Sequence, residues 1–322
     1  MPRIHFGLEI PNVLPWETLC AAALRADLQR WRTLWTYDHL LPCTAEELPL
    51  TVSSAEDCEA GPILEGWTLL AALAALTRRV RLGCMVSPAS FRPPGLLAKM
   101  AVTVDHISQG RVELGLGTGW HEREHEAFGI PLGSLRDRSD RLEEAAQVIR
   151  LLLSGPGPSD FQGRFFRLVR APFAPPPRQA HLPLLVAGGG EKRTLRTVAR
   201  YADACNLYGN VFGSLSEVRH KLRVLDELCQ EAGRDPGQVR RTVTLYGDVI
   251  EDPRRARELR AWLGQHLPDE EAEALPLGEP SRLIEAVEPY VALGVDEIVL
   301  NGPDLDLEGL ERLDRQVLAA FD

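Results

Sequence analysis

Residues 65–125 decide the fold, and they read EGWTLLAALAALTRRVRLGCMVSPASFRPPGLLAKMAVTVDHISQGRVELGLGTGWHEREH. In this stretch, residues 64–76 and 96–107 show apolar side chains at helical spacing. Residues 80–86 and 111–116 are short, mainly apolar runs of strand length. Such alternation between short apolar runs and longer helical patterns is typical of βα units around a parallel sheet.

The same alternation extends outward in both directions. The expected strands lie at residues 4–10, 33–37, 80–86, 111–116, 184–186, 204–207, 243–249 and 297–300. The expected helices lie at residues 15–28, 64–76, 96–107, 135–153, 192–201, 214–232, 253–266, 280–293 and 307–320. Eight strands with intervening helices predict an α/β fold, a (β/α)8 TIM barrel that occupies residues 1–322 as a single domain. A doubly wound open sheet is the alternative, but the first strand lacks the Gly-x-Gly-x-x-Gly turn of that fold.

Three insertions are expected in this barrel. One follows the second strand as a long loop over residues 40–63, and another follows the fourth strand. The third precedes the fifth strand, where residues 161–169 are interrupted by Gly163 and resemble a hairpin outside the barrel. Loops at these places are where barrel enzymes differ from one another, so we expect the substrate pocket there.

Composition narrows the function classes. The chain of 322 residues carries a net charge of -10, which disfavours nucleic acid and anionic membranes as partners. No apolar run reaches the ~20 residues of a membrane span, and the first residues lack the apolar core of a signal peptide. The six cysteines are scattered without metal-like spacing, so no metal site is expected. A cytoplasmic protein with a small-molecule substrate is the resulting expectation.

In a barrel, the strand ends carry the chemistry. The second strand ends in Asp38-His39, and a histidine at that place can take or give a proton near neutral pH. A solvated loop with Asp38 capping a turn is the competing interpretation. Histidines 121 and 125 have a spacing that suits a metal, but their acidic neighbours favour a solvated helical turn over the barrel mouth.

Glycines follow two further strands. Gly117, Thr118 and Gly119 follow the fourth strand, and Gly188, Gly189 and Gly190 precede Glu191 at the start of a helix. Free amides at a helix N-terminus form a cradle for a phosphate. A plain turn remains the alternative at both places.

Taken together, these motifs resemble the luciferase-like flavin and deazaflavin oxidoreductases, and in particular their F420-dependent branch. The resemblance is carried by residues 65–83, 91–101, 105–111, 115–120 and 124–125, and by residues 141–144 and 188–195. It implies a barrel that holds the ring of coenzyme F420, or alternatively of FMN, over the C-terminal ends of the strands. Members of this family are often homodimers.

The resemblance also implies roles for individual residues. His39 matches the catalytic histidine beside the reactive ring carbon. Cys84-Met85 matches a position where many members have a non-proline cis peptide bond behind the ring. The implied cofactor-binding residues are Asp38, Cys84, Met85, Gly117, Thr118, Gly119, Trp120, Gly188, Gly189, Gly190 and Glu191.

One position departs from the pattern. Several deazaflavin dehydrogenases have a glutamate after the fourth-strand glycines that acts with the histidine, and Trp120 stands there in this chain. Three functions therefore stay open: F420-dependent hydride transfer, which we favour, an FMN-dependent monooxygenase that uses reduced flavin and dioxygen, and a flavin-binding barrel without catalysis.

Overall fold

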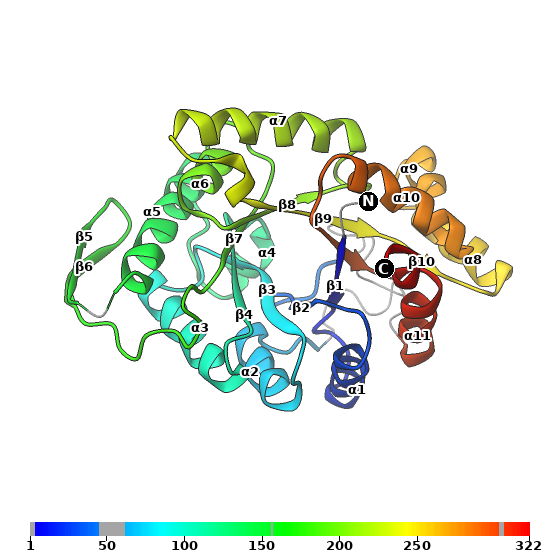
Figure 1. Ribbon diagram of the computed structural model, residues 1–322, viewed down its shortest axis with the longest axis horizontal. Helices are drawn as coiled ribbons and strands as arrows, with labels where there is room; N and C mark the ends of the chain where they lie inside the picture. The colour runs from blue at the N-terminus through cyan, green and yellow to red at the C-terminus, as the bar shows by residue number, and fades with distance from the viewer. Residues whose placement is uncertain (1–3, 45–61, 156, 303–305) are drawn as a thin grey trace.

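The protein forms a closed barrel of eight parallel strands, described by a computed structural model (Figure 1). The structure describes residues 4–44, 62–155, 157–302 and 306–322. The barrel order is β1-β12-β9-β8-β7-β4-β3-β2. The barrel strands are β1 (His5–Ile10), β2 (Thr33–Thr36), β3 (Arg81–Pro88), β4 (Val112–Gly117), β7 (Leu184–Ala187), β8 (Ala204–Tyr208), β9 (Arg240–Tyr246) and β12 (Glu297–Asn301).

Helices surround this barrel, as Figure 1 shows. They are α1 (Trp16–Asp27), α2 (Gly66–Leu76), α3 (Pro94–Ser108), α4 (Glu122–Ala127), α5 (Leu135–Leu153), α6 (Thr194–Tyr201), α7 (Leu215–Glu231), α8 (Pro253–Leu263), α9 (Asp269–Ala274), α10 (Pro280–Ala292) and α11 (Leu307–Gln316), with short 3-10 turns at Pro236–Gln238 and Leu318–Phe321. Within the described residues, no helix is long and apolar enough to cross a bilayer.

The predicted barrel is confirmed, including the order of strands and helices. The excursion before the fifth barrel strand is a hairpin of β5 (Ser159–Gln162) and β6 (Arg167–Ala171), which projects away from the barrel at the left of Figure 1. The predicted seventh strand is divided: β9 ends at Tyr246, and β10 (Asp248–Val249) pairs with β11 (Leu277–Gly278) outside the barrel. Most of the long loop after β2 lies outside the described residues.

Local chemistry explains why α2 starts where it does. The side chain of Glu65 accepts hydrogen bonds from the amides of Trp67 and Thr68, so it caps the first turn of α2. Trp67 is buried, and its indole Nε1 donates to Ser87 Oγ at 2.8 Å. These contacts fix α2 against β3, one of the strands whose C-terminal end reaches the site.

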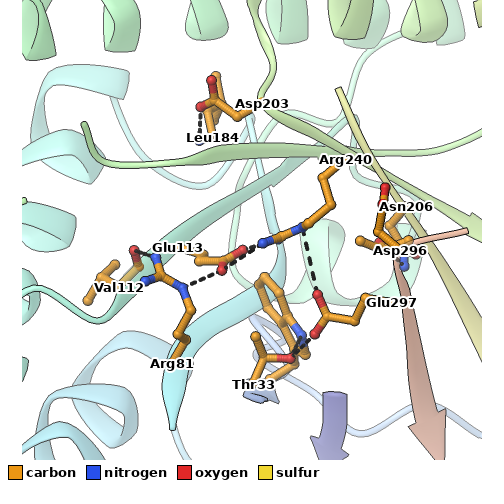
Figure 2. A network of polar contacts seen from close by, with 12 residues as sticks. Thr33, Arg81, Val112, Glu113, Leu184, Asp203, Asn206, Arg240, Asp296 and Glu297 are labelled. Carbon is orange, nitrogen blue, oxygen red and sulfur yellow. Dashed lines mark hydrogen bonds and ion pairs between the residues drawn. The ribbon is translucent and has the colours of Figure 1, made fainter. Parts of the chain in front are cut away.

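An ion network closes the barrel at the N-terminal ends of its strands (Figure 2). Glu113 is fully buried and pairs with Arg81, at 2.5 Å, and with Arg240. Glu297, also buried, accepts a hydrogen bond from Thr33 and lies 3.7 Å from Arg240. Burial opposes ionisation of Glu113, but the two arginines outweigh it and lower the pKa of that carboxyl. We therefore assign this network to stability, because the functional end of a barrel is the opposite one.

Candidate functional site

A cavity of about 630 Å³ opens at the C-terminal ends of the barrel strands. This volume is within the range of ordinary small-molecule sites. Many lining side chains are apolar or aromatic. The lining residues are Glu9, Val13, Leu14, Tyr37, His39, Leu41, Pro42, Cys43, Pro62, Ile63, Met85, Val86, Pro88, Gly117, Thr118, Gly119, Trp120, Ala187, Gly188, Asn206, Tyr208, Phe212, Thr244 and Tyr246.

His39 stands in this cavity and is held by a carboxylate. Its Nδ1 lies 3.0 Å from Oε1 and 3.1 Å from Oε2 of Glu124, and the amide of Leu40 donates to the same Oε2 at 2.9 Å. His121 Nδ1 lies 3.4 Å from the same carboxylate. Because Nδ1 of His39 faces Glu124, Nε2 is the nitrogen that His39 can offer to a molecule in the cavity.

Glu124 is ionised despite being buried. Burial would raise its pKa, but hydrogen bonds from His121 and His39 and from the Leu40 amide outweigh that effect and lower the pKa to about 2. The carboxylate therefore holds Nδ1 of His39 and orients the imidazole ring.

The turn expected at residues 121–125 is helical, as predicted, but His121, Glu124 and His125 are not solvated. These residues begin α4, and His121, Glu124 and His125 are each almost fully buried. The turn folds over the barrel mouth, where Glu124 faces His39, and the Nε2 of His125 lies 2.8 Å from Ser90 Oγ. Spacing alone missed Glu124 because its partner lies 85 positions away in the chain.

Trp120 stands beside the catalytic candidate. Its ring lies edge-on to His39 at a centroid distance of 5.6 Å and stacks on His121 at 5.1 Å. Trp120 is 44% exposed and lines the cavity. The position after the fourth-strand glycines thus supplies an aromatic wall, while the carboxylate for His39 comes from Glu124, four residues further along.

Asp38 and Cys84 lie behind the cavity wall. Asp38 accepts a bidentate pair of hydrogen bonds from Arg92, at 2.6 and 2.9 Å, and Cys84 Sγ is 3.4 Å from Thr36 Oγ1. Both residues are fully buried and neither lines the cavity. Their contacts make them supports for the neighbouring His39 and Met85.

Met85 lines the cavity, as expected for a residue that packs against a ring. The non-proline cis peptide bond joins Met85 to Val86, so the position expected for it, Cys84-Met85, is wrong by one residue. The physical context is a bulge: Cys84 pairs with Leu114 and Ser87 with Leu116, which leaves one extra residue on β3.

The loop after β4 contributes Gly117, Thr118 and Gly119 to the lining, as predicted from the sequence. A Cβ on Gly117 would lie 2.6 Å from Cγ2 of Val86, so only glycine lets β4 pack against the bulge. Gly119 has a φ of 78°, a conformation that favours glycine.

The glycines after β7 divide into two groups. Gly188 lines the cavity, whereas Gly189, Gly190 and Glu191 lie outside its lining. Glu191 faces α7, where its Oε1 lies 2.6 Å from Lys221 Nζ and 3.1 Å from His220 Nε2. The loop therefore presents backbone next to a cation, Lys221, which is a suitable surrounding for an anionic tail.

Sequence reasoning missed the polar groups of the opposite wall. Glu9, Tyr37, Tyr208 and Tyr246 all line the cavity. Asn301 Nδ2 donates to Glu9 Oε2 at 3.1 Å and to the Tyr37 hydroxyl at 2.9 Å. The sequence held a signal for this wall: Glu9 lies among apolar residues near the end of the strand at residues 4–10, and a buried carboxyl needs a polar partner.

The residues present fit a flavin-type ring. The cavity has an apolar floor at Met85 and Val86, and glycine backbone at Gly117, Gly119 and Gly188 that allows close approach. His39, which has the buried carboxylate of Glu124 as its partner, lines the same cavity. That set suits redox chemistry in which a proton moves together with two electrons.

Comparison with known proteins agrees with a flavin-type site. A model of the family described as luciferase-like monooxygenase matches residues 32–297. The fold and the site define a flavin-type oxidoreductase barrel, and the chain belongs to the luciferase-like monooxygenase family.

The curated relatives match different lengths of the chain. Pyrimidine monooxygenase RutA of Allorhizobium ampelinum is 34% identical over 177 residues, which are 54% of this chain and 47% of RutA. The match thus spans about half the length of RutA. An uncharacterised protein of Mycobacterium tuberculosis H37Rv, Rv0953c, is 29% identical over 235 residues, or 72% of this chain and 80% of that protein.

Solved structures with the same fold include an F420-dependent enzyme and a riboflavin lyase that holds a modified FMN. An F420-dependent secondary alcohol dehydrogenase, in complex with an F420-acetone adduct, superimposes with a TM-score of 0.82 at 20% identity and covers 100% of both chains. The monooxygenase RslO1 from Streptomyces bottropensis gives a TM-score of 0.79 at 22% identity, covering 99% of this chain and 100% of RslO1. At these identities the likeness shows the fold alone.

Proposed function

We propose that this protein is an F420-dependent oxidoreductase that transfers hydride to or from a small organic substrate bound in the cavity. The observation that carries the proposal is the pair of His39 and Glu124, because a histidine held by a buried carboxylate moves the proton that accompanies a hydride. In this reaction a bound deazaflavin would supply the carbon that takes or gives the hydride.

His39 is the proposed catalytic residue. Its Nε2 takes the proton of a substrate hydroxyl during oxidation and returns a proton during reduction. Glu124 acts through His39: it holds Nδ1, fixes the ring orientation and stabilises the imidazolium. Trp120, edge-on to His39, walls the proton-transfer site and limits the access of water.

The other predicted residues would hold the cofactor. Met85 and the loop of Gly117, Thr118 and Gly119 would contact the ring, and the loop of residues 188–191 would contact the phosphate side. Asp38 and Cys84 would act from behind, because Asp38 pairs with Arg92 and Cys84 contacts Thr36. Residues 1–322 would form one domain around this site.

A second candidate is an FMN-dependent monooxygenase that uses reduced flavin and dioxygen. The likeness to a pyrimidine monooxygenase at 34% identity over 177 residues favours it. The same His39, Met85 and glycine loops would then face a flavin. A non-catalytic barrel has less support, because a binding module has no use for a buried ion pair behind His39.

The test is an anaerobic hydride-transfer assay with F420 and a panel of secondary alcohols, and with reduced F420 and a panel of ketones and enones. Turnover is followed by the visible absorbance of F420. We expect turnover in wild type, a strong loss in His39→Ala, and wild-type rates in His106→Ala, which alters an exposed histidine on α3. Turnover only with reduced FMN and dioxygen would replace the first candidate by the second.

A further inference from the structure

The cavity has two chemically different walls. The candidate cofactor residues Met85, Gly117 and Gly188 come from β3, β4 and the loop after β7, which are neighbours in the barrel. The remaining five strands, β8, β9, β12, β1 and β2, form the other side. They carry Tyr208, Tyr246, Asn301, Glu9 and, directly after β2, Tyr37, which we call the polar wall.

The polar wall is fixed by its own hydrogen bonds. Asn301 uses both amide protons, one for Glu9 Oε2 at 3.1 Å and one for the Tyr37 hydroxyl at 2.9 Å. Tyr208 and Tyr246 stack at a centroid distance of 6.3 Å. Among the described residues, Oε1 of Glu9 has no hydrogen-bond partner, and Glu9 faces the cavity. One oxygen of a buried carboxyl is therefore left for a ligand.

This carboxyl differs from the other buried glutamates in lacking a cationic partner. Glu113 has two arginines and Glu124 has two histidines, whereas the neighbour of Glu9 is a neutral amide. Burial raises the pKa of Glu9 to about 8, and the hydrogen bond from Asn301 opposes this only in part. At neutral pH the side chain is thus an uncharged acid, which can donate one hydrogen bond and accept another.

The lining also lacks a counter-charge for an anion. No lysine or arginine belongs to the described residues that line the cavity, and its one basic side chain, His39, faces Glu124 through Nδ1. A carboxylate or phosphate placed against the polar wall would lose its hydration without gaining a cation, and it would oppose ionisation of Glu9.

We propose that the polar wall recognises the substrate through an uncharged group that both donates and accepts hydrogen bonds, of the carboxamide or lactam class, and that Glu9 makes this contact. The claim that the ligand is the substrate rests on the proposed function, whereas the selectivity for uncharged ligands does not. The body of the ligand would be mainly apolar, because most of the remaining lining side chains are apolar.

The test uses benzamide and benzoate, which have the same shape and differ in charge. Their dissociation constants are measured by calorimetry at pH 6.5 and pH 9, with the protein alone and with its bound cofactor. We expect benzamide to bind wild type roughly 10-fold or more tightly than benzoate at pH 6.5. Its affinity should fall about 10-fold by pH 9, because Glu9 then ionises.

The Glu9→Gln variant tests whether Glu9, and not a neighbouring titratable group, causes the pH dependence of benzamide binding. Glutamine keeps a donor and an acceptor but no ionisation, so benzamide binding should become independent of pH. The other titratable groups near Glu9 are Tyr37, Tyr208, Tyr246, Cys43 and His39; burial raises the pKa of Tyr37 and of Tyr246, and all five are unchanged in the variant. Glu126→Gln, which alters an exposed carboxyl on α4, should retain the wild-type pH dependence.

Several results would overturn the proposal. They are benzoate binding as tightly as benzamide, a Glu9→Gln variant that titrates like wild type, and an altered cofactor affinity in Glu9→Gln, which would place the wall against the cofactor ring. Absence of binding of both probes would count equally against it. If probe selectivity holds but no hydride transfer occurs with any substrate, the proposed function fails and the ligand class stands.

Discussion

Nδ1 of His39 lies 3.0 Å from a carboxylate oxygen of Glu124, although the two residues are 85 positions apart. His39 follows β2, and Glu124 belongs to α4, a helix in the insertion after β4. The barrel supplies the histidine and the insertion supplies its partner. The insertion is therefore part of the proposed proton-transfer machinery as well as a wall of the pocket.

Glu124→Gln should lower kcat by a factor of about 10²–10⁴, the usual contribution of acid–base catalysis, because glutamine loses the negative charge and one of the two carboxylate oxygens that contact Nδ1 of His39. His39→Ala should lose a similar factor, and the double variant should lose little more than either one. Since the pKa of Glu124 is about 2, Glu124 should add no step to the pH–rate profile of wild type above pH 4, while Glu124→Gln should shift the profile itself. Steady-state rates across pH measure both effects. Full kcat and an unshifted profile in Glu124→Gln would contradict the assigned positioning role.

Glu9 should make the stability of the protein depend on pH. Its folded pKa of about 8 exceeds the ordinary value of 4.5, so the folded state holds the proton more tightly than the unfolded state. The free energy of unfolding should therefore decrease as the pH rises from about 4.5 to 8, and Glu9→Gln should remove this decrease. The difference between wild type and variant should reach a few kcal/mol at pH 9, measured by urea unfolding. Parallel curves for the two proteins from pH 5 to pH 9 would show that Glu9 is not a neutral acid.

The ion network at the other end of the barrel should matter for stability and not for the cofactor. Arg240→Ala leaves Glu113 and Glu297 buried with less compensation, and should cost about 3–5 kcal/mol of the free energy of unfolding. Arg200→Ala removes only an exposed pair with Glu143 and should cost less than about 1 kcal/mol. Denaturant unfolding and cofactor titration of both variants check this. A wild-type stability in Arg240→Ala would refute the role given to the network.

Gly117→Ala tests the contact between β4 and the bulge of β3. The new methyl group would lie 2.6 Å from Cγ2 of Val86, so Val86 has to shift into the cavity. We expect about 1–3 kcal/mol of destabilisation and weaker cofactor binding. Gly155→Ala, where no atom lies within 4 Å of the new methyl group, is the matched control. Equal cofactor affinity in both variants would show that the bulge does not contribute to cofactor binding.

The sequence was sufficient where local patterns determine structure. Apolar periodicity located all eight barrel strands, and the strand ends located His39 and the loop of Gly117–Gly119 in the cavity lining, where the family resemblance also placed Met85. It failed where a side chain finds its partner through the closed barrel. Glu124 lies in a run of charged residues that predicts exposure, but it is buried against His39. The hydrogen-bond partner of Glu9 is Asn301, which lies 292 positions later in the chain. The one-residue displacement of the cis bond has the same origin, since the bulge is defined by pairing with β4.

The most direct test of the central claim is a titration of the purified protein, freed of any bound cofactor, with F420 and with FMN, followed by the fluorescence of each cofactor. The account predicts that F420 binds with a micromolar or tighter Kd and that FMN binds roughly 10-fold more weakly or not at all. Micromolar binding of FMN without binding of F420 would contradict it.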